Sequence, residues 1–349
     1  MGLSVRQVQR LKKRMAEEGP SGLAHKLRGR SSNRKISPRV QEWALGLIRE
    51  KYADYGPTLA AETLEEVHGF KVGRETLRRW MIHDGLWLSR KERKRFQQPR
   101  LRREHIGELV QIDGSEHRWF EERGAPCSLL VFIDDATSRL QKLWFCEAES
   151  TFSYFQALEG DLTEHGRPLA LYSDKHSVFK LNRPSKRSGE TMTQFGRALA
   201  ELQIEIICAD TSQAKGRVER ANRTLQDRLV KALRAEGIST INEANAFLPG
   251  FVERFNAKFA RRPAKETDLH RPLRQSDRQL REVLCLKIQR YVGGQLTVTY
   301  DRKKIILDPE GTAKGLVGKY VDIHQYADGS FSIVYAGEAL PHKIFDNAQ

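Results

Sequence analysis

The sequence predicts a multidomain α+β protein with helix-turn-helix units at the N-terminus, a central α/β core and a small β module at the C-terminus. Three observations predict this organisation. Amphipathic, strongly basic helical patterns broken by short Gly turns occupy the first part of the chain. From residue 106, short apolar runs and helical patterns follow in the order βββαβαβα. After residue 284, short strands return, separated by turns that contain Gly, Pro and Asp.

Composition indicates a soluble protein of two to four domains, because 349 residues exceed one ordinary domain and 39% are hydrophobic. No apolar run reaches the ~18–20 residues of a membrane span, and the N-terminus lacks the apolar segment of a signal peptide. The cysteines, Cys127, Cys146, Cys208 and Cys285, are far apart and form no CxxC pair. This spacing favours reduced core residues in a cytoplasmic protein over disulfides or zinc ligands.

The net charge of +15 is concentrated at the N-terminus. Residues 1–103 hold 25 Lys and Arg against 11 Asp and Glu, whereas the rest of the chain is nearly neutral. A basic module joined to a near-neutral one is typical of a nucleic-acid-binding region attached to a domain with another role. A merely soluble surface is the alternative, but the basic residues fall within helical patterns.

Two helical regions and two basic linkers are expected before the core. Residues 1–18 contain a basic amphipathic helix that begins after Ser4, typical of the recognition helix of a partial helix-turn-helix. Residues 37–88 predict a helix-turn-helix domain, with a structural three-helix bundle as the alternative. Residues 19–36 and 89–105 are linkers suited to a phosphate backbone. The cations expected on DNA here are Arg6, Arg10, Arg30, Arg34, Arg74, Arg78, Arg79, Lys91, Arg93, Lys94 and Arg95.

The core is predicted over residues 106–238. Three short runs predict an antiparallel meander of strands at 107–113, 127–134 and 139–146. The pattern continues with a helix at 151–165, a strand at 168–174, a helix at 191–202, a strand at 204–209 and a helix at 217–236. This order is that of ribonuclease H-like domains. Beyond the core, residues 239–283 predict helices and a linker, and about five short strands in 284–349 favour a small SH3-like β-barrel.

Three carboxylates mark a candidate catalytic and metal-binding site. Asp113 and Asp174 each end an apolar run, and Glu219 lies near the start of a helix. Two acids at strand ends and one on a helix can meet at one edge of a sheet, although either aspartate alone could simply end its strand. Such a cluster repels itself unless cations neutralise it, and hard oxygen ligands suit Mg²⁺ or Mn²⁺. Two such ions can drive in-line displacement at phosphorus, so the sequence predicts phosphoryl transfer on nucleic acid.

The helix that carries Glu219 predicts its surroundings. Glu219 lies one residue from the apolar stripe, so it is expected to border the core instead of projecting into solvent. Asn222 shares its face and is a candidate to support the carboxylates. The neighbouring cations expected on DNA are Lys215, Arg217, Arg220 and Arg223.

Other polar residues near these strands receive more modest interpretations. His176, two residues after Asp174, is close enough to support the site, although a structural role competes. Asp134 and Asp135 follow a strand, and they are interpreted as turn formers that bind nearby backbone instead of a metal ion.

Four segments resemble the DDE family of transposases and retroviral integrases. Their sequences are most similar to those of bacterial insertion-sequence transposases of the ISNCY group. They are Gln-Ile-Asp-Gly-Ser at 111–115, Ile-Asp-Asp-Ala-Thr-Ser-Arg at 133–139, Tyr-Ser-Asp-Lys-His at 172–176 and Gly-Arg-Val-Glu-Arg-Ala-Asn-Arg-Thr-Leu-Gln at 216–226. The resemblance spans about residues 37–345. It implies an integrase-type catalytic core with Asp113, Asp174 and Glu219 as the triad and two Mg²⁺ or Mn²⁺ ions per site.

The resemblance also implies what the protein acts on. Terminal inverted repeats and target DNA would be its double-stranded DNA partners, bound by a homo-oligomer in a synaptic complex, in the bacterial cytoplasm at the nucleoid. The expected function is cleavage that exposes 3′-OH ends, followed by joining to target DNA. The alternatives are a domesticated DNA-binding regulator with an inactive core and a ribonuclease H-type nuclease that cuts RNA–DNA hybrids.

Overall fold

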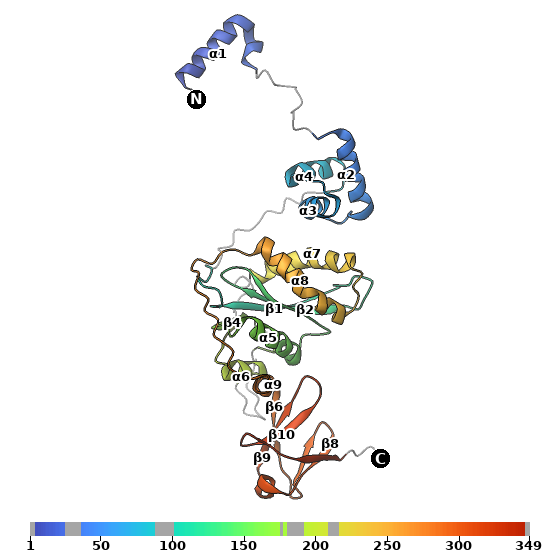
Figure 1. The fold of residues 1–349 in the computed structure, drawn as a ribbon, viewed down its shortest axis with the longest axis vertical. Coiled ribbons are helices and arrows are strands. Elements are labelled where there is room, and N and C mark those ends of the chain that lie inside the picture. Colours follow the sequence, from blue (N-terminus) through green and yellow to red (C-terminus); the bar gives the residue numbers. More distant parts are fainter. Residues whose placement is uncertain are drawn as a thin grey trace. The chain divides into compact units, whose positions relative to one another are not determined.

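The computed structural model describes residues 4–24, 36–87, 101–174, 177–179, 192–208 and 216–345 (Figure 1). The chain divides into two compact units, residues 1–95 and 96–349, and each is considered by itself. Most of both predicted basic linkers lies outside the described residues. Within the described part of the chain, no helix has the length and apolar character to cross a membrane.

The N-terminal unit begins with α1 (Val5–Glu18), followed by the short 3₁₀ helix η1 (Gly19–Leu23). Ser4 caps α1 through a capping box with Gln7, because each side chain bonds the backbone N–H of the other residue. The predicted helix is therefore confirmed. None of its residues is buried, and its apolar residues Val5, Val8 and Met15 are exposed.

Three further helices of this unit are α2 (Pro38–Lys51), α3 (Pro57–His68) and α4 (Arg74–His83). Pro38 follows the capping residue Ser37, and α3 ends at Gly69 in the left-handed conformation that glycine favours. The helices enclose one apolar cluster, which consists of Ala44, Leu45, Ile48, Ala60, Ala61, Leu64, Val72, Leu77 and Met81. The predicted three-helix unit is present, with the Arg-bearing helix last.

The core of the second unit is a five-stranded sheet in the order β3-β2-β1-β4-β5. Its strands are β1 (Val110–His117), β2 (Cys127–Asp134), β3 (Leu140–Cys146), β4 (Ala170–Ser173) and β5 (Glu205–Cys208). The first three form the predicted antiparallel meander, and β4 and β5 run parallel to β1. The helices that follow complete the predicted order βββαβαβα.

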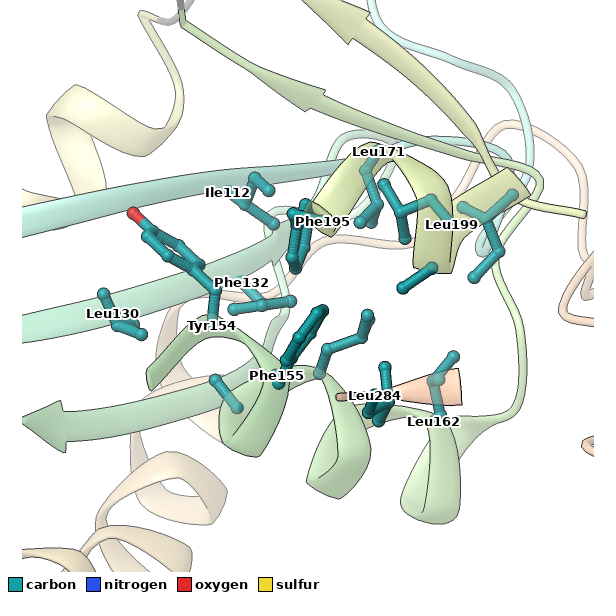
Figure 2. Close-up of a cluster of buried hydrophobic side chains, with 14 of the residues drawn as sticks. Ile112, Leu130, Phe132, Tyr154, Phe155, Leu162, Leu171, Phe195, Leu199 and Leu284 are labelled. Atoms are coloured by element: carbon teal, nitrogen blue, oxygen red, sulfur yellow. The ribbon is translucent and has the colours of Figure 1, made fainter. Parts of the chain in front are cut away.

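Helices cover both faces of this sheet (Figure 1). On one face lie α5 (Thr151–His165) and α6 (Gln194–Glu201), and on the other lie α7 (Val218–Ala235) and α8 (Ile241–Phe259). Figure 2 shows Ile112, Leu130 and Phe132 of the sheet facing residues of α5 and α6. Because both faces are covered, every residue of β2 is buried.

The predicted first strand is displaced in the structure. The sequence places it at 107–113, whereas β1 runs from Val110 to His117. Pairing with β2 extends to His117 opposite Cys127, so the polar segment after Asp113 belongs to the strand despite its poor strand propensity. Asp113 therefore lies in the interior of β1 and does not end it.

The C-terminal segment follows α9 (Asp277–Val283) and forms two open sheets, β11-β10-β9-β6 and β12-β8-β7. Its strands are β6 (Leu286–Tyr291), β7 (Thr297–Tyr300), β8 (Lys303–Leu307), β9 (Tyr320–Gln325), β10 (Phe331–Tyr335), β11 (Glu338–Ala339) and β12 (His342–Phe345), with the 3₁₀ helix η3 (Gly311–Gly315) before β9. The two sheets share one apolar cluster that includes Val298, Ile305 and Ile323. The predicted strands are present, but a closed SH3-like barrel is not shown.

Candidate active site

The two candidate aspartates lie on neighbouring strands. In the parallel pair β1–β4, Val110 is opposite Leu171 and Gln111 is opposite Tyr172. Two more residues in the same register place Asp113 beside Asp174, the first residue after β4. Both side chains are half-buried. Because β4 ends at Ser173, no described residue pairs with β1 beyond Asp113 on that side.

Helix α7 is attached to β1 by a ladder of side-chain hydrogen bonds. Odd-numbered residues of β1 face α7, and their partners on the helix recur every four residues. The bonds are Val218 N to Gln111 Oε1 at 3.2 Å, Asn222 Nδ2 to Asp113 Oδ2 at 2.9 Å, and Gln226 Nε2 to Ser115 Oγ at 3.1 Å. The first turns of α7 therefore lie directly against the strand that carries Asp113.

Glu219 belongs to the first turn of α7, between Val218 and Asn222. Both of those neighbours contact β1, so the backbone at Glu219 lies close to Asp113. The expectation that Glu219 borders the core is wrong, because its side chain is exposed. The adjacent Val218 belongs to the apolar stripe and is fully buried. Because successive residues of a helix are rotated by about 100°, the side chain of Glu219 points outward.

The amide group of Asn222 lies beside the Asp113 carboxylate. Asn222 is 8% exposed, and its Oδ1 atom has no hydrogen-bond partner among the described residues while its Nδ2 atom holds Asp113. A buried acceptor without a partner is uncommon and marks a place where a cation or a water could bind. In the described part of the chain, no three His, Cys, Asp or Glu side chains are already grouped to hold a metal ion.

The prediction that Arg217 contacts DNA is wrong. Its side chain is 8% exposed, and its Nη1 atom lies 2.7 Å from Oδ1 of Asp135, which is fully buried. Gln111 Nε2 donates to the same oxygen at 2.6 Å. Arg217 is thus part of the core and cannot reach a phosphate as a surface cation would.

The two acids after β2 have different roles. Asp134 accepts hydrogen bonds from the backbone N–H and the hydroxyl of Thr137, at 2.7 and 2.6 Å, and from Gly107 N at 3.1 Å. Its interpretation as a turn former is confirmed, and burial raises the pKa of its carboxyl. Asp135 is more than a turn former, because it is the buried partner of Arg217.

Glu149 is a further carboxylate next to Asp113 that the sequence pattern does not predict. A Cβ atom on Gly114 would lie 2.0 Å from Cδ of Glu149, so this carboxylate packs directly on β1 next to Asp113. The Tyr154 hydroxyl donates to Glu149 Oε2 at 2.8 Å, and Figure 2 shows that hydroxyl directed away from the apolar cluster. Burial, and then the Glu149 carboxylate, raise the pKa of Tyr154, with further contributions from Asp113 and Asp174. The Gly after Asp113 was the one sequence signal for this contact.

The other predicted site residues divide into three groups. Seven cations and His176 lie outside the described residues, namely Arg30, Arg34, Lys91, Arg93, Lys94, Arg95 and Lys215. Six are exposed, namely Arg6, Arg10, Arg74, Arg79, Arg220 and Arg223. Arg78 is half-buried and bonds Glu75 at 2.9 Å on the same helix, which leaves it less available to DNA.

Known proteins resemble this chain in sequence. Residues 7–81, which span α1 to α4, match a homeodomain-like domain. Over its whole length the chain is 58% identical to "Putative transposase y4bF" of Sinorhizobium fredii, of which it covers 76%. It is 28% identical to the transposase for insertion sequence IS1202 of Streptococcus pneumoniae, with 99% of this chain and 82% of that protein aligned.

Solved structures resemble it more distantly. The HTLV-2 integrase catalytic core domain in complex with magnesium, in its dimeric form, is 18% identical over 41% of this chain and 83% of that chain, with a TM-score of 0.30. The simian T-cell lymphotropic virus intasome in complex with PP2A regulatory subunit B56 gamma is 14% identical over 85% of this chain and 97% of that chain, with a TM-score of 0.37. Both TM-scores are below 0.5, so these likenesses assign no function to this chain.

A homeodomain-like helical unit joined to this α/β core, together with two transposases as relatives, places the chain among the polynucleotidyl transferase-type enzymes. Identity of 58% over the full chain narrows the class, and the chain belongs to the family of insertion-sequence transposases. It therefore binds DNA and acts in DNA transposition.

Proposed function

We propose that the protein binds the terminal inverted repeats of its element, cleaves them to expose 3′-OH ends and joins those ends to target DNA. One observation carries this proposal. Asp113 and Asp174 lie side by side in the register of β1 and β4, and hydrogen bonds attach the helix turn that carries Glu219 to the same strand. Two neighbouring aspartates and a glutamate on the adjacent helix turn would supply the acids that two-metal phosphoryl transfer requires.

The residues present fit divalent metal ions. Carboxylates supply the hard oxygen ligands that Mg²⁺ and Mn²⁺ prefer, and the unpartnered Oδ1 of buried Asn222 lies beside Asp113. Asp113, Asp174 and Glu219 would hold two ions. When bound, the ions would activate the attacking oxygen and stabilise the leaving oxygen. Asn222 would meanwhile fix the orientation of the Asp113 carboxylate through its Nδ2 bond.

The N-terminal unit supports the recognition of element ends. Arg74 and Arg79 are exposed on α4, the last helix of the helix-turn-helix unit, and Arg6 and Arg10 are exposed on α1. Arginines can read guanine edges in the major groove and also bind phosphates. Arg220 and Arg223 on the exposed side of α7 would hold the DNA backbone next to the carboxylates.

The wider organisation follows from the same proposal. The domain boundaries would be 1–18, 19–36, 37–88, 89–105, 106–238, 239–283 and 284–349. The C-terminal sheets would contact DNA or a neighbouring subunit, and closure into an SH3-like barrel remains part of the proposal. Because two element ends must be joined together, a dimer or larger homo-oligomer would hold them in a synaptic complex at the bacterial nucleoid.

The test is strand cleavage and joining on a labelled duplex that carries the inverted repeat flanking the gene. The wild-type protein is incubated with Mg²⁺ or Mn²⁺ beside a Glu219→Gln variant. We expect a 3′-OH at the repeat boundary and joined products, both absent with the variant. Specific binding of the repeat without any metal-dependent cleavage would instead support the DNA-binding regulator with an inactive core. Preferential cutting of an RNA–DNA hybrid would support the ribonuclease H-type nuclease.

A further inference from the structure

The start of α7 is held by distant side chains instead of a local cap. Its N-cap residue, Arg217, makes no side-chain cap bond. The first backbone N–H of the helix, that of Val218, is bonded by Gln111 Oε1 from β1. Helix starts leave several N–H groups without intrahelical partners, and an end without a cap frays. The order of this turn therefore depends on β1 and on whatever holds Gln111.

Asp135 is the centre of the group that holds Gln111. Its Oδ1 atom accepts from Arg217 Nη1 at 2.7 Å and from Gln111 Nε2 at 2.6 Å, and its Oδ2 atom accepts from the backbone N–H of Arg103 at 2.8 Å. Asp135 and Gln111 are fully buried and Arg217 nearly so. Buried charges need both pairing and hydrogen bonds, and this group supplies both.

The segment that enters the core from the N-terminal unit ends in the same group. Nη1 of Arg102 donates to the backbone oxygens of Asp135 and Ala136, at 3.1 and 3.2 Å, and to Ser138 Oγ at 2.8 Å. With the Arg103 N–H bond to Asp135, this segment is fixed to the turn after β2. The strand of Asp113, the helix of Glu219 and the chain from the DNA-binding unit therefore share one buried carboxylate.

We propose that Gln111, Asp135 and Arg217 form a clamp that positions Glu219 for catalysis. Glu219 is exposed, so its location is set by the backbone of the first turn of α7, which the clamp fixes. A cation at a helix start opposes the helix dipole, and the Asp135 carboxylate next to Arg217 neutralises that charge. This inference rests on the proposed function, since it assigns these three residues a positioning role for its reaction.

The other end of α7 supplies a matched control. There Arg234 pairs with Glu121, with Nη2 and Oε1 2.5 Å apart, but the two side chains are 37% and 35% exposed. The Arg217–Asp135 pair and the Arg234–Glu121 pair each join α7 to a residue of the segments that flank the sheet strands. The second lies more than three turns from Glu219, so weakening it should affect the stability of the helix without moving the candidate ligand.

The experiment compares Asp135→Asn and Gln111→Met with Glu121→Gln in the full chain. Asp135→Asn keeps the shape and an acceptor oxygen while removing the charge, and Gln111→Met removes the bond to Val218 N but leaves the buried ion pair. Hydrogen exchange of the peptide spanning 217–223 reports on the helix start without requiring catalysis. We expect exchange to be on the order of tenfold faster in both clamp variants than in the wild type. In the Glu121→Gln control, the exchange rate of this peptide should equal that of the wild type.

Metal binding and cleavage test the functional half. We expect each clamp variant to bind Mn²⁺ on the order of tenfold more weakly and to cleave the repeat duplex on the order of tenfold more slowly, a scale typical of residues that orient metal ligands. Binding of the duplex should not change. In a Glu219→Gln background, adding Gln111→Met should cause no further loss of Mn²⁺ affinity, because the clamp acts through Glu219.

Each result has a definite meaning. Wild-type exchange, Mn²⁺ affinity and cleavage in Gln111→Met, which is the variant least prone to misfold, would overturn the clamp while leaving the transposase function intact. Additive losses with Glu219→Gln would overturn its action through that residue. If the wild-type protein itself fails to cleave, the proposed function fails, and exchange and Mn²⁺ binding still decide whether the clamp orders the first turn of α7.

Discussion

The two faces of β1 differ in chemistry although they alternate along one strand. Gln111, Asp113 and Ser115 point toward α7, and each makes a polar bond to that helix. Val110 and Ile112 point toward α5 and α6 and belong to an apolar cluster. Because successive side chains of a strand face opposite sides, neighbouring positions can serve catalysis and stability separately. Substitutions at four consecutive residues, 112–115, should therefore give four distinct results.

The largest effect is expected on the α7 face at Asp113. Asp113→Asn keeps an acceptor for Asn222 but removes a charge that the proposed metal ions need. We expect strand cleavage to fall by at least ~10³-fold, equivalent to ~4 kcal/mol of lost transition-state stabilisation, with unchanged thermal stability. Single-turnover cleavage measures it. Asp227→Asn, which removes an exposed carboxylate on α7, should cleave like the wild type.

At Ile112, on the opposite face of β1, substitution should lower the stability of the fold and should not affect catalysis directly. Ile112 is fully buried among α5 and α6 side chains (Figure 2). Ile112→Ala should lower the free energy of unfolding by about 2–5 kcal/mol, because it leaves a cavity in a packed core. Urea unfolding of the full chain measures the loss. The change Leu169→Ala, at a side chain that is 37% exposed, should cost far less. Equal losses in the two variants would show that the α5 face is not the packed side.

Substitution of Gly114 should have an intermediate effect on stability. Gly114 lies on the α5 face of β1 but packs against the Glu149 carboxylate instead of an apolar side chain. An added methyl group would meet the Glu149 carboxylate, which must then move away from the Tyr154 hydroxyl. Gly114→Ala should therefore cost about 1–3 kcal/mol of stability. Thermal unfolding measures it, and Tyr154→Phe should remove part of the difference, since the displaced contact no longer exists. If Gly114→Ala is as stable as the wild type, Glu149 does not occupy this space.

Ser115, on the α7 face, should give the smallest effect. Ser115→Ala leaves the Gln226 amide without its acceptor and should cost about 1 kcal/mol. The double variant Ser115→Ala with Gln226→Leu removes both partners and should recover much of that loss. Comparing the free energies of unfolding of the four proteins gives the coupling between the two side chains. Additive losses would mean that the bond contributes nothing to attaching α7.

How far the sequence predicts this molecule depends on how local each signal is. Helix α5 has the predicted bounds because its signals are local, and the structure shows Ser150 capping its start. The end of β1 is a misplaced boundary, because Gly114 to His117 has poor strand propensity and belongs to the strand only through its pairing with β2. The element order of the core was predicted, whereas the closed barrel at the C-terminus is not shown.

Within the site, individual acids were recognisable but their surroundings were not. Asp113 and Asp174 stand out as acids next to apolar runs. Arg217 reads as one more surface cation in a basic stretch, because the residue that buries it, Asp135, lies 82 positions earlier. Glu149 gives no sequence signal of its own either, since its contact with Gly114 depends on how the connection between β3 and α5 packs on β1.

The clamp also determines when the catalytic site can form during folding. Its bonds join residues separated by 24, 32, 82 and 107 positions, whereas the helix-turn-helix unit is complete within the first 87 residues. Contacts between distant positions form late, because long loops must close first. A chain emerging from the ribosome thus acquires its DNA-binding surface well before Glu219 is in place. Under the proposed function, the ability to cut DNA would therefore be completed late in folding.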